Sequence, residues 1–71
     1  MPQVVQVVVY PSAPDGGRRV RVGGSFVGMA YTVIDVVEFL RGAGLEDVEP
    51  EDVVSAEWIE WRGGGPGDWV H

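Results

Sequence analysis

The segment QVVQVVVY, residues 3–10, constrains the fold more than any other part of this 71-residue chain. β-Branched valines dominate it and neither glycine nor proline interrupts it, which predicts a β-strand. Side chains of a strand point alternately to its two faces. Here both faces are mostly apolar, with Val7 and Val9 on one and Val4 and Val8 on the other. Such a strand needs a covering layer on each side.

A second strand is predicted over residues 18–22, RRVRV, where polar and apolar side chains alternate. Its two valines share one face, and Arg19 and Arg21 point to the other. The Gly-Gly pair at 23–24 favours a tight hairpin turn, and residues 25–30 then form a short return strand. Three strands are therefore expected in the first thirty residues, each antiparallel to the one before it.

One amphipathic helix is predicted over residues 33–43. Thr32 can cap its first turn, and Asp35 stands three residues on, where a capping box places an acid. Because β-branched residues lower helix propensity, this helix must be held by packing against the sheet. Its apolar stripe consists of Val33, Val36, Val37, Leu40 and Ala43.

The second half of the chain contains one more predicted strand. Pro50 followed by two acids is typical of a helix start, and about one helical turn is expected there. Residues 55–62 then fit a strand better than a helix. The glycine-rich stretch at 63–67 cannot be regular structure, and it forms either a wide turn that returns Trp69 to the sheet or a frayed tail.

Together these elements predict a single small domain, residues 1–71, of the α+β class. We expect an antiparallel sheet of three or four strands with one helix packed on one face, in ββ(β)αβ order. The predicted core consists of Val5, Val7, Val9, Val20, Val22, Val33, Val36, Val37, Leu40 and Trp58.

Charge and composition exclude several classes of function. The net charge is -6, and the excess of acids lies beyond residue 34. Such a field repels nucleic acid and anionic lipid and favours a protein partner with a basic surface. No apolar run is long enough for a membrane span, and residues 3–10 lack the basic flank of a signal peptide, so we expect a cytoplasmic protein.

No catalytic, cofactor-binding or metal-binding residue is predicted. Cysteine is absent, and the single histidine, His71, stands at the end of the chain, where a side chain is seldom fixed. Asp47, Glu49 and Glu51 have the spacing of calcium-loop carboxylates, but the glycine and the final carboxylate of that loop are missing. We expect a protein that is not an enzyme.

The tryptophans are the most informative residues for function. Three lie within twelve positions beside an arginine, and both residue types are enriched at the energetic centres of interfaces. They either form the core layer on the sheet face away from the helix or belong to an interface with a second subunit. The interface residues predicted on the second view are Trp58, Trp61, Arg62, Trp69 and Tyr10.

The stretch WRGGG, residues 61–65, and the order of the elements resemble the ubiquitin-like β-grasp family. Modifiers and sulfur carriers of that family end in a strand followed by Gly-Gly. The resemblance implies a precursor whose tail, residues 66–71, a protease removes to free a glycine carboxylate.

Three functions follow as hypotheses. The first is a non-catalytic interaction or regulatory module that self-associates as a homo-oligomer such as a homodimer, because its apolar surface exceeds what one helix can cover. The second is the β-grasp modifier or sulfur-carrier precursor. The third is an accessory subunit of a larger enzyme.

Overall fold

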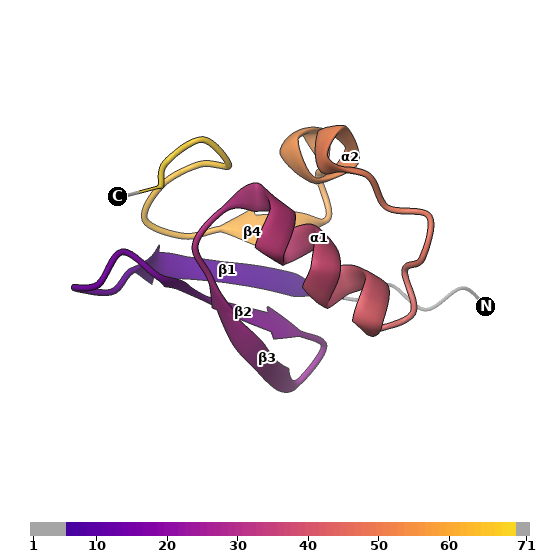
Figure 1. Cartoon of the computed structure of the whole chain (residues 1–71), viewed down its shortest axis with the longest axis horizontal. Helices are drawn as coiled ribbons and strands as arrows, with labels where there is room; N and C mark the ends of the chain where they lie inside the picture. Colours follow the sequence, from indigo (N-terminus) through magenta and orange to yellow (C-terminus); the bar gives the residue numbers. More distant parts are fainter. Residues whose placement is uncertain (1–5, 70–71) are drawn as a thin grey trace.

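The computed structural model describes residues 6–69, which form a four-stranded sheet and two helices (Figure 1). The predicted α+β class is confirmed, with the main helix following the third strand. In chain order the elements are β1 (Val7–Ser12), β2 (Arg18–Val22), β3 (Ser25–Ala30), α1 (Val33–Gly42), α2 (Pro50–Ser55) and β4 (Ile59–Trp61).

The strands are arranged in the order β3-β2-β1-β4. The pairs β1–β2 and β2–β3 are antiparallel, whereas β4 lies parallel to β1. The sheet is therefore mixed rather than wholly antiparallel. Parallel neighbours need a long crossover, and α1 and α2 supply it between β3 and β4. This order is β-grasp-like.

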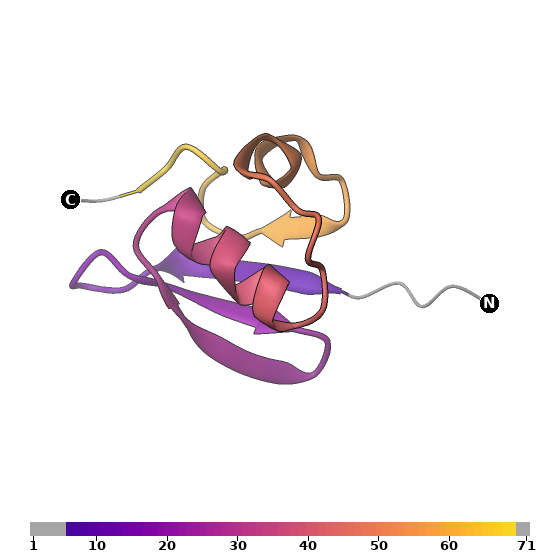
Figure 2. The same cartoon turned by 45° about the vertical axis from the view of Figure 1, so that its right-hand side comes forward.

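Both helices lie on the same side of the sheet, with α1 crossing it and α2 packed beside α1 (Figures 1 and 2). The buried core between sheet and helices comprises Val7, Val9, Val20, Ala30, Val36, Val37, Leu40, Val53 and Ile59. Six of these were predicted from the sequence. Val22 and Val33 are partly buried and pack against this core, and Val5 lies outside the described residues.

Trp58 was predicted in the core, and that prediction is wrong, since the residue is 39% exposed. The reason is that α2 continues to Ser55, and a turn separates it from β4. The strand was predicted over residues 55–62, and in the structure it covers only Ile59–Trp61. Ile59 consequently takes the buried position opposite Val7.

A side-chain cap fixes the start of α1, and a glycine on β3 lets the helix pack closely on the sheet. The Thr32 hydroxyl accepts a hydrogen bond from the Asp35 backbone N–H, as predicted for the cap, and the Asp35 carboxylate accepts one from the Tyr31 N–H. On β3, Gly28 has a φ of 155°, and a Cβ atom there would lie 2.8 Å from the Phe39 ring. Glycine therefore lets α1 approach the strand backbone directly.

No helix among residues 6–69 is long and apolar enough to cross a membrane.

Within residues 6–69, the sheet face opposite α1 has no helix over it (Figures 1 and 2). We call this side the open face. It carries Val8 and Tyr10 from β1, and Arg19 and Arg21 from β2.

Candidate functional site

Arg18 is the one charged residue buried among those described, with 1% of its surface exposed. It stands on the same face of β2 as Val20 and so points to the helix side of the sheet. All five of its N–H groups donate to backbone carbonyl oxygens. Nε donates to Tyr10 at 2.8 Å, Nη1 to Gly65 and Asp68 at 2.9 and 3.1 Å, and Nη2 to Arg62 and Gly64 at 3.0 and 2.9 Å.

Two tryptophans enclose the same guanidinium. The Arg18 Cζ atom lies 5.4 Å from the Trp61 ring centroid and 5.2 Å from that of Trp69, within cation–π range. The two rings meet edge to face at 6.2 Å. Burial lowers the pKa of Arg18, and the Asp68 charge opposes that shift. The group still keeps its proton at neutral pH, because arginine starts from so high a pKa.

The glycine-rich stretch is consequently a closed turn around Arg18, the first of the two predicted alternatives. The Asp68 carboxylate accepts the Gly65 N–H at 2.7 Å, and the Trp69 indole N–H donates to the Pro66 carbonyl at 2.7 Å. Gly63 adopts a φ of 73°, with its backbone against Pro11. We call residues 62–69, folded around this guanidinium, the arginine-centred turn.

The open face combines guanidinium groups with aromatic rings. Cross-strand pairing aligns Val8 with Arg21 and Arg21 with Phe26, and it sets Arg19 beside Met29. Shallow hollows lie between these side chains and Tyr10. Phe26, near the start of the edge strand β3, is 58% exposed, which is a large exposure for a phenylalanine.

Stacking orders the arginines of this face. Arg19 lies over Phe26 with its Cζ atom 5.9 Å from the ring centroid, and Arg21 and Arg62 lie over Tyr10 at 6.0 and 5.2 Å. Arg62 also forms an exposed ion pair with the neighbouring Glu60, which raises the pKa of the Arg62 guanidinium. These contacts hold the charged groups over the rings and leave them accessible to a partner.

A second surface feature is a groove on the helix side, between the end of α1 and the turn before β4. We call it the acidic groove. Its lining includes Leu45 and Val48 as apolar floor, with Trp58 at the rim. The acidic residues in its lining are Glu46, Asp47, Asp52 and Glu57.

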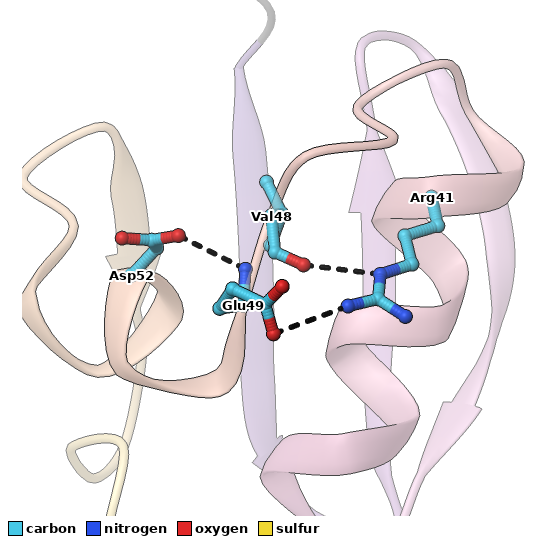
Figure 3. Close-up of polar contacts among 4 residues, drawn as sticks. All are labelled: Arg41, Val48, Glu49 and Asp52. Carbon is cyan, nitrogen blue, oxygen red and sulfur yellow. Dashed lines mark hydrogen bonds and ion pairs between the residues drawn. The ribbon is translucent and has the colours of Figure 1, made fainter.

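Polar contacts fix the connection that forms this groove (Figure 3). Arg41 donates from Nε to the Val48 carbonyl at 3.0 Å and pairs with the Glu49 carboxylate at 3.4 Å. The Asp52 carboxylate accepts the Glu49 N–H at 2.9 Å and caps α2. Both acids therefore have structural partners. Among residues 6–69 no group of three or more acidic or histidine side chains is arranged to hold a metal ion.

The five residues predicted for an interface do not form one patch. Tyr10 and Arg62 meet on the open face, whereas Trp61 and Trp69 lie on the helix side around Arg18. Trp58 stands apart at the acidic groove. Trp61 and Trp69 are half-buried on the helix side, not in a core layer on the face away from the helix, and their role in an interface stays a prediction.

Sequence reasoning missed the roles of Phe26, Met29 and Arg18. The alternation of RRVRV, which separates Arg19 and Arg21 from the valines, also places Arg18 on the valine face. Because Arg18 has the same orientation along the strand as Val20 and Val22, the alternation indicated a buried arginine. Phe26 carried a similar signal, because the hairpin turn pairs it with Arg21 across β2 and β3.

The chain matches no protein-family model, no curated protein and no solved structure.

Proposed function

We propose that this chain is a non-catalytic protein-interaction module that self-associates in the cytoplasm. The open face is the observation that carries the proposal. It exposes Phe26 beside Tyr10 and Met29, and stacking holds three guanidinium groups over its rings. Aromatic residues, methionine and arginine are the residue types enriched in protein interfaces.

The open face replaces the tryptophan cluster as the main reason for this proposal. Trp61 and Trp69 already pack against Arg18 within the chain, and only Trp58 keeps a large exposed surface. On the open face the exposed apolar side chain is Phe26, with the partly buried Tyr10 and Met29 beside it. A second copy would cover this face.

Sedimentation velocity over a concentration series tests this function. We expect a sedimentation coefficient that rises with concentration, and a Phe26→Ser change that weakens the association. Phe26 is exposed in the single chain, so this change leaves the fold intact. A matched change, Ile34→Ser, removes another exposed apolar residue, on α1 and outside both the open face and the acidic groove, and should leave association unchanged. A wild-type chain that stays monomeric at every concentration contradicts the proposal.

A β-grasp modifier or carrier precursor is the second candidate, favoured by the strand order and by the glycines that follow β4 after Arg62. The arginine-centred turn argues against it, since Arg18 holds the carbonyls of Gly64 and Gly65 and Trp69 packs beside it. Intact mass of the protein from its native host distinguishes the two. Truncation after Gly64 or Gly65 supports the precursor, and a full-length chain opposes it.

An accessory subunit of a larger enzyme, or a module for a protein with a basic surface, would use the same surfaces. The acidic groove with Trp58 at its rim suits a basic partner. Co-purification from the host in a constant ratio with one larger protein would favour either of these over self-association.

A further inference from the structure

Three of the four exposed arginines among the described residues of this acidic protein lie on one face. Of its five arginines, Arg18 is buried. On the helix side, Arg41 donates a hydrogen bond to the Val48 carbonyl and forms an ion pair with the Glu49 carboxylate. The other three, Arg19, Arg21 and Arg62, lie on the open face, where Glu60 is their acidic neighbour. An arginine stacked on a ring still has donors for a carboxylate.

The helix side carries the opposite charge. Residues 44–58 contain six acidic side chains and no basic one. Arg41 pairs with Glu49, and in the described part of the chain no ion pair is found for Glu46, Asp47 or Glu57, which line the acidic groove. Trp58, 39% exposed, adds an apolar rim to these carboxylates.

These two surfaces cannot meet within one molecule. The acidic groove is lined by residues 44–58, which lie with the helices on one side of the sheet, and the open face is on the other side. Figure 2 shows the helices and their connections on that one side. Two open faces cannot pair well with each other either, because the contact would bring Arg19 and Arg21 against their own copies. The complement of the open face that this protein itself carries is the acidic groove of a second copy.

We propose that the open face of one copy docks on the acidic groove of the next copy, in a head-to-tail contact that rests on the self-association proposed above. Arg19 and Arg21 bind the groove carboxylates, and Phe26 and Trp58 supply the apolar contact. A docked pair still has one free open face and one free acidic groove, so the contact repeats and yields a ring or an open chain rather than a two-fold dimer.

Two neutralising variants test this arrangement by sedimentation velocity. Arg19→Gln/Arg21→Gln disables the open face, and Glu46→Gln/Asp47→Asn disables the groove. Each variant alone is expected to raise the dissociation constant by about tenfold or more. An equimolar mixture retains one intact pairing, the groove of the first with the open face of the second, and should give a one-to-one heterodimer that does not grow.

The control variant Glu38→Gln/Glu51→Gln removes two exposed carboxylates that lie outside the groove, and it should associate like the wild type. Raising salt from about 0.05 M to about 0.5 M should weaken the wild-type assembly, because exposed charges are screened. Wild-type association that is unchanged in both neutralising variants overturns the head-to-tail contact but leaves self-association standing. A strictly monomeric wild type overturns both. Variants that weaken association but give no heterodimer on mixing also overturn the contact.

Discussion

Arg18 carries a positive charge into the interior without a carboxylate as its hydrogen-bond partner. Burying an ion is costly unless its polar groups are satisfied, and here each of the five guanidinium N–H groups has a carbonyl acceptor. Both tryptophan rings also lie within cation–π range of the planar guanidinium. Trp61 is less well satisfied, since its buried indole Nε1 finds no acceptor among residues 6–69.

Replacing Arg18 by methionine should destabilise the protein by about 3–5 kcal/mol, because it removes five hydrogen bonds from a charged donor to backbone carbonyls. This loss approaches the whole stability expected for a domain of this size, about 4–10 kcal/mol. Lysine should not rescue the fold, since its three donors cannot serve five acceptors. Urea unfolding followed by tryptophan fluorescence measures the loss.

The exposed neighbour Arg19 provides the control for this prediction. Arg19→Met should change the free energy of unfolding by no more than about 0.5 kcal/mol. If Arg18→Lys or Arg18→Met unfolds at the wild-type urea concentration, the carbonyl contacts do not stabilise the fold.

A second residue-scale prediction concerns Tyr31, whose hydroxyl donates to the Asp15 carboxylate at 2.7 Å. This hydrogen bond raises the pKa of Tyr31; the Asp15 pKa is lowered chiefly by the Gly17 N–H and further by Tyr31. The stability that Tyr31 contributes is therefore complete below its unfolded pKa of about 10 and is lost as pH rises through the higher folded value.

Absorbance titration of the tyrosinate checks this. The transition that Tyr31→Phe removes should have its midpoint above about 10, and Asp15→Asn should lower that midpoint toward the ordinary value. A Tyr31 midpoint that is the same with and without the Asp15 carboxylate would show that the hydrogen bond is absent in solution.

At the scale of elements, local sequence predicted the first half of the chain better than the second. Alternation and the Gly-Gly turn located β2 and β3, and the apolar stripe located α1. The helical turn predicted from Pro50 is confirmed as α2 (Pro50–Ser55), whereas the strand predicted over residues 55–62 is formed only by Ile59–Trp61. Burial of Val53 in the core holds α2 although β-branched residues lower helix propensity.

The contact between α1 and β3 depends on Gly28. Gly28→Ala should cost about 2 kcal/mol or more, because the methyl group would overlap the Phe39 ring and the φ of 155° disfavours any side chain. Adding Phe39→Leu should recover part of this cost. The free energies come from chemical unfolding of both single variants and the double variant.

Gly24→Ala is the matched control, since a Cβ atom there meets nothing within 4 Å. It should stay within about 0.5 kcal/mol of the wild type. Costs that simply add in the Gly28→Ala/Phe39→Leu variant would mean that the ring and the glycine do not interact.

For the whole molecule, the sequence predicted the class and the element order but not the direction of β4 or the arginine-centred turn. The strand direction depends on how α1 and α2 carry the chain across the sheet, and periodicity holds no information on that path. The turn depends on Arg18 and residues 62–68, which lie more than forty positions apart. Turn chemistry alone left a frayed tail as an equal alternative.

The turn should stabilise the whole domain rather than only its own residues. Trp69→Ala should cost about 2 kcal/mol, since it removes a half-buried ring that contacts Arg18 and Trp61. A chain that stops after Gly65 should lose at least as much, because the Asp68 carbonyl is lost as well. Urea midpoints of these variants measure the effect.

Trp58→Ala is the comparison, because Trp58 is exposed at the acidic groove and should cost less than about 1 kcal/mol. A shortened chain as stable as the full one would mean that residues 66–69 contribute nothing to the fold, which is what the modifier-precursor hypothesis requires.

Arg18 also imposes an order on biosynthesis. The ribosome makes this residue early, but four of its five acceptors, the carbonyls of Arg62, Gly64, Gly65 and Asp68, are made about fifty residues later. In an emerging nascent chain the Arg18 cation therefore lacks these acceptors and stays in water. Stable folding must wait until that later segment has left the exit tunnel, so we expect the domain to complete its fold in one late step rather than strand by strand.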